Sequence, residues 1–389
     1  MKQLINRTLL ILAVLCLAVN SVTAATPKYK ISKWKPNDGG IFESISADGK
    51  WGIINLGMTG GDTNIKCPSR IYDIDHDKDY TISFQGREMN ISAVSDVDSK
   101  GMLTVVGSLM GRPASCVFDT NTNTVVTTSL KTYKLSENWQ SGNLNAVTTD
   151  GKYAVGMQMG YYGKDSEDNE LGSDFWFTTI YVDIEAGSVI ETPGLPTKNL
   201  AGSDEFAMKF TGISPDGRYI IGEKDWFIMQ PNCPLSFLYD TKEHTYKVIG
   251  FTGTPGNYKG VVDGLHHIET PIFSPNGKLI SGDAYMAREQ EGSEFFNEYH
   301  TPFIYNVETG EFVNFDDADS QNVIGTAIDN DGNIYGAPEG GGPLRNFKIF
   351  YKQKYWIPFS QICQQIYGFN FSQKTGFEFT GTPVGVSGN

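Results

Sequence analysis

The sequence predicts an all-β protein, a β-propeller built from repeated four-stranded antiparallel sheets called blades. Three observations support this prediction. A Ser-Pro-Asp-Gly turn at residues 214–217 recurs in weaker copies along the chain, the copies are spaced by 50 to 66 residues, and each is followed by the same second strand pattern. Four strands per unit at such a period are typical of a propeller blade.

The recurring turn joins two short strands. Pro215 fixes its own φ, Asp216 accepts backbone hydrogen bonds, and Gly217 adopts a positive φ without steric cost. The next residues, 219–221, are Tyr-Ile-Ile, the side chains of a buried strand. The turn glycines of the six copies are Gly49, Gly101, Gly151, Gly217, Gly277 and Gly332.

The second pattern is an apolar or aromatic strand that ends, in its clear copies, at Asp or Asn. Its copies are Ile71-Tyr72-Asp73, Val117-Phe118-Asp119, Tyr181-Val182-Asp183, Leu238-Tyr239-Asp240, Ile304-Tyr305-Asn306 and, less clearly, Ile349-Phe350-Tyr351. In these residues the chain resembles the WD-like repeats of extracellular β-propellers in the TolB-like or WD-like superfamily, and most closely the HAF-type repeats. The resemblance covers about residues 41–389. It implies a fold and carries no catalytic residues.

The repeats divide most of the chain into blades. They span about residues 41–84, 91–135, 144–191, 210–250, 269–315 and 323–357. A helix-like connector at 358–368 follows, because apolar residues recur there at helical spacing. Residues 380–389 match the start of another repeat, with Ser387 and Asn389 aligned to Ser214 and Asp216. We therefore expect a seventh blade that is truncated at Asn389 in the given sequence.

The first 24 residues have the form of a secretory signal peptide. Lys2 and Arg7 precede an apolar run at 9–19, and small residues lead to a cleavage position after Ala24. Residues 25–389 then form a single propeller domain, and the mature protein is expected in the periplasm, at the cell surface or outside the cell. No later run is long enough to span a bilayer as a helix.

The charge balance excludes some partners. The whole chain carries a formal net charge of −14, and removal of Lys2 and Arg7 with the signal peptide makes it about −16. Such a surface disfavours nucleic acids and anionic membranes. The chain has only five histidines and none lies in a recognisable nucleophile motif, which argues against a serine or cysteine hydrolase.

Four cysteines are candidates for disulfides, and one acidic loop is a candidate for a metal site. Cys67 and Cys116 precede equivalent strands of neighbouring repeats and are the one pair worth testing for a disulfide; Cys233 and Cys363 complete the set, and buried free thiols are the favoured state. Residues 73–79 imitate the start of a calcium loop, but Lys78 and Phe84 replace its required Gly and Glu. We therefore expect no cofactor, with calcium as the weaker alternative.

The candidate binding residues lie in long connections. Segments 157–174, 192–206, 251–268 and 284–300 follow second strands or link blades, so they are expected on the face opposite the Asp-Gly turns. Aromatic residues near acids suit a glycan or a peptide or protein, although Trp176 and Phe177 fit packing between blades better. The candidates are Tyr161, Tyr162, Trp226, Tyr258, His266, His267 and Tyr299.

An enzyme is the alternative interpretation. Glu223 and Asp283 each follow the glycine that ends the second strand of their repeats, so they occupy matching heights on adjacent blades. Paired acids at one end of a propeller channel would suit a glycoside hydrolase or a lyase. A secreted binding protein remains the main prediction.

Overall fold

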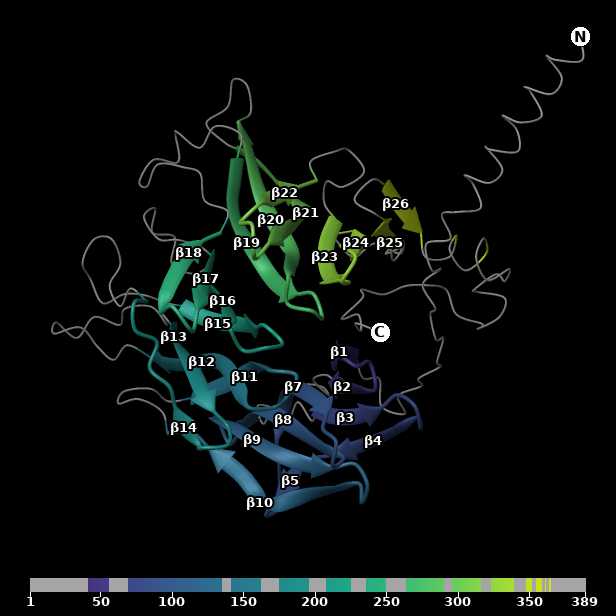
Figure 1. The fold of residues 1–389 in the computed structure, drawn as a ribbon, viewed down its shortest axis with the longest axis vertical. Helices are drawn as coiled ribbons and strands as arrows, with labels where there is room; N and C mark the ends of the chain where they lie inside the picture. The colour runs from purple at the N-terminus through teal and green to yellow at the C-terminus, as the bar shows by residue number, and fades with distance from the viewer. Residues whose placement is uncertain are drawn as a thin grey trace, which may run out of the picture.

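The computed structural model describes residues 41–55, 69–134, 141–161, 175–195, 208–224, 236–249, 264–289, 296–315, 323–338, 348–351 and 355–358, together with Gln361 and Gln364. These residues form six four-stranded antiparallel sheets and one two-stranded hairpin. The prediction of an all-β propeller of four-stranded blades is confirmed. Figure 1 shows the sheets following one another around a common centre.

The six sheets are consecutive along the chain, and each runs from its first to its fourth strand without a crossover. Sheet one contains β1 (Ile41–Ile45), β2 (Trp51–Asn55), β3 (Ser69–Asp73) and β4 (Lys78–Thr81). Sheet two contains β7 (Asn90–Val97), β8 (Met102–Leu109), β9 (Arg112–Asp119) and β10 (Thr124–Thr132). Sheet three contains β11 (Ser141–Val147), β12 (Tyr153–Tyr161), β13 (Phe175–Asp183) and β14 (Ser188–Val189).

The second half of the chain repeats this arrangement. Sheet four contains β15 (Met208–Ile213), β16 (Tyr219–Lys224), β17 (Ser236–Asp240) and β18 (Thr245–Val248). Sheet five contains β19 (Gly264–Phe273), β20 (Leu279–Glu289), β21 (Phe296–Asn306) and β22 (Phe312–Asn314). Sheet six contains β23 (Val323–Ile328), β24 (Ile334–Pro338), β25 (Lys348–Tyr351) and β26 (Tyr355–Pro358).

Both short turns of each blade lie at the same end of the sheet, which we call the turn end. In sheet four, the Thr241 amide after the third strand donates to the Arg218 carbonyl in the Asp-Gly turn. The same bond joins Ile74 to Lys50 and Ile184 to Lys152. The opposite end, where second strands finish and third strands begin, is called the loop end.

The Asp-Gly turn has the same internal structure in successive sheets. The Ser214 hydroxyl donates to Asp216 at 2.6 Å and accepts from the Tyr219 amide at 2.9 Å, while Asp216 accepts from the Arg218 amide. Equivalent hydroxyl and acid pairs close the turns of sheets one and three, and Ser274 with Asn276 closes that of sheet five. These bonds explain why the sequence repeats Ser or Thr two residues before Asp or Asn.

Each innermost strand contains a β-bulge near its middle. The register shifts at Phe42/Ser44, Ile91/Ala93, Leu144/Ala146, Phe210/Gly212, Glu269/Ile272 and Gly325/Ala327. In sheet three the bulge brings the Asn143 carbonyl so close that a Cβ on Gly156 would lie 2.0 Å from its oxygen. The glycine that ends the repeat motif is therefore required by the bulge beside it.

Apolar side chains pack between adjacent sheets. Trp51 and Tyr80 of sheet one pack on Phe118 of sheet two, with ring centroids 5.7 and 5.3 Å from that of Phe118. Val155 of sheet three lies in one buried cluster with Phe210 and Phe237 of sheet four. Each blade thus buries its faces against its neighbours, as a propeller requires.

The structure shows where the first repeat ends and which state Cys116 adopts. The first repeat was expected to continue to Phe84, but β4 ends at Thr81 and Phe84 belongs to a separate hairpin, β5 (Ser83–Phe84) with β6 (Arg87–Glu88). Gln361 and Gln364 are helical, and the connector at 358–368 stays a prediction. Cys116 is a buried free thiol, and burial raises its pKa to about 12. The signal peptide, Cys67, Cys233, Cys363 and residues 380–389 lie outside the described residues.

Asp73, the first acid of the calcium-like segment, serves the β3–β4 turn. One of its oxygens accepts from the Asp75 and His76 amides, and the other lies 2.7 Å from His76 Nδ1. Within the described residues, no group of three or more His, Cys, Asp or Glu side chains has a metal-binding arrangement. No helix among those residues meets the length and hydropathy of a membrane span.

Candidate functional site

The loop end contains the described candidates for ligand binding. Tyr161 ends β12 opposite Phe175, His266 and His267 belong to β19, and Tyr299 belongs to β21. The strands concerned are longer than the five- or six-residue strands of sheets one and four: β12 and β13 have nine residues, and β20 and β21 have eleven. Tyr162, Trp226 and Tyr258 lie outside the described residues.

Sheet five brings three polar residues to one level. His267 of β19 lies opposite Tyr285 of β20, which lies opposite His300 of β21. Tyr299 lies opposite Met286, one step further along the ladder. His267 and Tyr299 are thus combined on one sheet, whereas Tyr161 belongs to sheet three.

His300 forms a pair with Asp283, which lies two residues from Tyr285 along β20, towards the turn end. His300 Nδ1 is 2.5 Å from Asp283 Oδ2, the Asp283 side chain is 3% exposed, and the His300 side chain is 16% exposed. A buried carboxylate at Nδ1 fixes the ring orientation and leaves Nε2 directed away from the acid. Asp283 was a sequence candidate, but His300 was not. The signal that could have found it is the antiparallel register, which places His300 diagonal to Asp283.

Glu223 occupies the corresponding position in sheet four. It is the fifth residue of β16, as Asp283 is of β20, so the expected equivalence of the two acids is present in the register. Its carboxylate lies 2.9 Å from Lys209 Nζ on the neighbouring strand β15. Each acid therefore has a basic partner on its own sheet, and the geometry presents two acid–base pairs.

Sheet six packs beside the aspartate–histidine pair. A Cβ on Gly325 of β23 would lie 2.9 Å from the Gly282 carbonyl oxygen and 3.2 Å from Pro302 Cβ. Pro302 is directly opposite Asp283, so β23 lies on this side of sheet five. The pair is consequently enclosed at the boundary between two blades.

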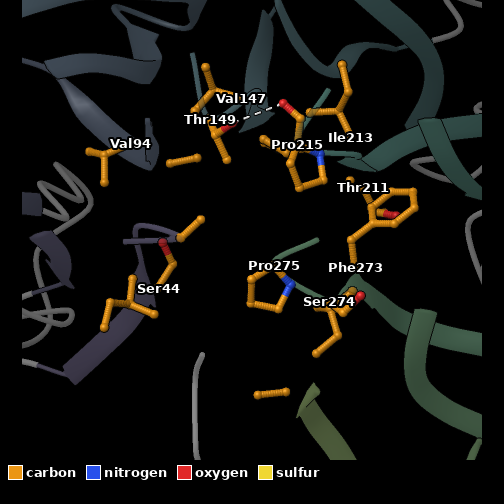
Figure 2. A pocket seen from close by; sticks show the side chains of 18 of the residues that line it. Ser44, Val94, Val147, Thr149, Thr211, Ile213, Pro215, Phe273, Ser274 and Pro275 are labelled. Carbon is orange, nitrogen blue, oxygen red and sulfur yellow. Dashed lines mark hydrogen bonds between the residues drawn. The ribbon is translucent and has the colours of Figure 1, made fainter. Parts of the chain in front are cut away.

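A second site lies in the central channel, and the sequence candidates did not include it. A cavity of about 250 Å³ is lined by residues from the innermost strands of all six sheets. The lining extends from the bulges to the Asp-Gly turns, where Thr149, Pro215 and Pro275 contribute, so the cavity occupies the turn half of the channel. Figure 2 shows labelled side chains from several strands around this space and the bond from Thr149 to Pro215.

Polar residues at the bulges give the cavity its chemistry. Ser92, Asn145, Thr211 and Thr326 stand at the register shifts of four different sheets and line the cavity. The sequence signal was available as a polar residue before the turn glycine, at six positions for Asn145, Thr211 and Thr326 and at nine for Ser92. It was missed because a bulge, which decides where that residue points, cannot be read from alternation alone.

The cavity lining is weakly acidic. Among the described residues of the lining, Asp96 is the one carboxylate and there is no Lys, Arg or His. Burial raises the pKa of Asp96, an effect opposed by the hydrogen bond that its Oδ1 accepts from the Asp48 amide at 2.8 Å. The cavity therefore favours groups that donate hydrogen bonds or carry positive charge.

Comparison with known proteins identifies the fold alone. No family model and no curated protein matches the chain. Among solved structures, the chain is similar to oligogalacturonate lyase from Vibrio parahaemolyticus, with 12% identity, coverage of 83% of this chain and 79% of that one, and a TM-score of 0.50.

Two further similar structures have lower scores. The β-propeller domain of the Trilobed protease from Pyrococcus furiosus has 15% identity, coverage of 82% and 84%, and a TM-score of 0.44. TolB from Acinetobacter baumannii has 15% identity, coverage of 74% of this chain and 58% of that one, and a TM-score of 0.38. The HAF-type resemblance stays a prediction.

Proposed function

We propose that this protein is a secreted or surface-exposed propeller that binds an extracellular glycan or peptide at its loop end. The observation that supports this proposal most is the length of the connections between second and third strands. In sheets one, three and four these connections span residues 56–68, 162–174 and 225–235, while the turn end is closed by short turns throughout the described sheets. Elaborated connections on a rigid scaffold are the usual location of binding residues.

The residues at that end suit polar polymers. Tyr161, Tyr299 and His267 stand on the extended strands, and the pairs formed by Asp283 with His300 and Glu223 with Lys209 lie nearby in the same sheets. Tyrosine supplies contact area with a hydrogen-bonding tip, and acid–base pairs supply donors and acceptors. Export to the periplasm, the cell surface or the medium rests on residues 1–24.

The test is a binding screen of the mature chain on glycan and peptide arrays. We expect Tyr161→Ala and Tyr299→Ala each to weaken the best hit at least tenfold, since aromatic residues dominate binding surfaces. Tyr246→Ala is the matched control, because Tyr246 is exposed on the outermost strand β18 of sheet four. Equal losses in all three variants, or no hit on either array, would refute the proposal.

The aspartate–histidine pair supports a second candidate function, acid–base catalysis on a glycan. His300 Nε2 would take a proton from water or from the sugar, and the buried Asp283 would stabilise the resulting imidazolium. Asp283 acts here as a positioning residue. Hydrolysis and elimination both require such a base.

Activity on a polysaccharide panel tests this candidate. If turnover is found, His300→Gln should lower kcat by about 10²–10⁴-fold, the usual range for a general base. Asp283→Asn should lower kcat and shift the pH profile, whereas Lys209→Met should change neither. An active His300→Gln protein, or an inactive wild-type chain, would exclude the role.

A further inference from the structure

We infer that the central cavity is a binding site for a small organic ammonium compound, held by Asp96 and a ring of oxygen acceptors. This goes beyond the proposed binding at the loop end, because the cavity occupies the other half of the channel and uses different residues. Hydrogen bonds within the protein decide which polar atoms of the cavity lining remain to contact a ligand.

Four of the hydroxyl groups that line the cavity donate their protons within the protein. The Thr149 hydroxyl donates to the Pro215 carbonyl at 3.1 Å, and those of Thr211 and Thr326 donate to backbone carbonyls at 3.5 and 3.4 Å. The Ser274 hydroxyl donates to Asn276 at 2.8 Å. Each hydroxyl that has donated its proton retains a lone pair, so these groups present acceptors to a ligand.

The amide groups lead to the same result. Asn145 Nδ2 donates to the Phe210 carbonyl at 2.8 Å, and Asn143 Nδ2 donates both to Asn145 Oδ1 at 2.9 Å and to Ser92 Oγ at 2.8 Å. Three of the four side-chain N–H groups of these two asparagines are directed at protein oxygens. Among the described residues, the lining has no basic side chain and is rich in oxygen acceptors, which disfavours phosphate, carboxylate or sulfate ligands.

Asp96 sets the preferred charge. It is half-buried, its Oδ1 accepts from the Asp48 amide, and no basic side chain among the described residues lines the cavity. Lys50, which lies outside the lining, opposes the effect of burial on the pKa of Asp96, but burial dominates and raises it. An ammonium group in the cavity would add the cation that the lining does not supply. The volume of about 250 Å³ is below the ~300–1,000 Å³ of pockets for larger ligands, so the compound is small.

The cavity walls also present apolar side chains. Ile213, Phe273 and Ile328 alternate with the polar residues, and Pro215 and Pro275 stand at the turns. Such a lining accommodates the carbon skeleton of an amine, with the polar ring fixing its orientation. Amino sugars and short aliphatic amines fit this description.

The experiment compares matched ammonium and neutral compounds by isothermal titration calorimetry on the mature chain. Glucosamine, putrescine and ethanolamine are paired with glucose, 1,4-butanediol and ethylene glycol, in phosphate buffer because Tris is itself an amine. We expect at least one amine to bind ten or more times as tightly as its neutral partner, as charge-assisted hydrogen bonds imply.

Asp96→Asn should weaken that binding about tenfold or more while keeping the acceptor for the Asp48 amide. Asp98→Asn is the matched control. Asp98 is two residues away and accepts from the Lys100 and Met102 amides, but it does not line the cavity. Failure of all three amines, or equal weakening by both substitutions, would overturn the inference, the latter because general negative charge would explain the binding.

Discussion

The two ends of the disc hold adjacent sheets together in different ways. At the turn end, backbone amides carry most of the connections: the Asp96 amide donates to the Thr149 carbonyl, and the Thr149 amide donates to Pro215. Towards the loop end, serines make them: Ser69 accepts from the Ile91 amide, and Ser236 donates to the Ile268 carbonyl. Backbone connections tolerate many side chains, whereas serine contacts depend on single residues.

Sheet two shows that the loop end need not be elaborated. Its second and third strands meet at Leu109 and Arg112 through a two-residue turn, in which Met110 and Gly111 both have positive φ. In sheets one, three and four the same junction includes much longer segments, 56–68, 162–174 and 225–235. The fold therefore does not demand those segments, which is why we associate them with function.

The largest effect is expected at the enclosed pair of the loop end. His300→Leu removes the ring from Asp283, a side chain that is 3% exposed, and breaking a buried ionic pair costs about 3–5 kcal/mol. Urea unfolding of the variant measures this loss. A value below 1 kcal/mol would show that the site tolerates solvent, and the boundary between sheets five and six would then be more open than the structure indicates.

A backbone substitution should have the next largest effect, at the turn end. Gly151 has a φ of +71°, and a Cβ there would lie 2.2 Å from Thr104 Oγ1 of sheet two. Gly151→Ala should cost about 2–5 kcal/mol, from left-handed strain and overpacking together. Gly86→Ala is the control: its φ is +76° with nothing within 4 Å, so only strain applies. Equal costs in urea unfolding would contradict the close contact between turns.

The repeating parts of the fold were predictable from the sequence because they are local. The hydroxyl–acid–glycine turn is formed by four consecutive residues, and its bonds at Ser214 and Asp216 follow from their spacing. The β5–β6 hairpin was missed because its strands, Ser83–Phe84 and Arg87–Glu88, are only two residues long and lack an apolar pattern.

The candidate sites were less predictable because they depend on contacts between strands. The sequence placed Asp283 directly after the end of the second strand, but β20 continues to Glu289, so Asp283 lies within the ladder. Its partner His300 comes from the neighbouring strand in diagonal register. The channel residues Ser92 and Thr326 required knowledge of the bulges, which are a property of strand pairing. Strand pairing joins residues that are distant in the sequence, so a single sequence does not show which of these side chains will meet.

A smaller effect is expected on raising the pH, from the boundary between sheets three and four. Burial raises the pKa of Tyr181 to about 12, above the ordinary value of 10.0. Because the folded-state pKa is the higher one, this contribution to stability is complete below pH 10 and is lost as the pH rises to about 12. Unfolding followed by circular dichroism should show a steeper loss over pH 10–12 for the wild type than for Tyr181→Phe. Identical slopes would contradict the burial of the phenol.

The smallest effect is expected for the ion pair of Glu223, the residue of sheet four that corresponds to Asp283. Glu223 and Lys209 have side-chain exposures of 12% and 28%, so water screens their attraction far more than it screens the enclosed pair. Lys209→Met keeps the apolar stem that covers the strand and removes only the charge, and we expect a loss of about 0–1 kcal/mol in urea unfolding. The ratio of the stability loss in Lys209→Met to that in His300→Leu measures how strongly the packing of sheet six on sheet five strengthens the aspartate–histidine pair. If Lys209→Met costs as much as His300→Leu, position in the repeat, and not enclosure, sets the energy of these pairs.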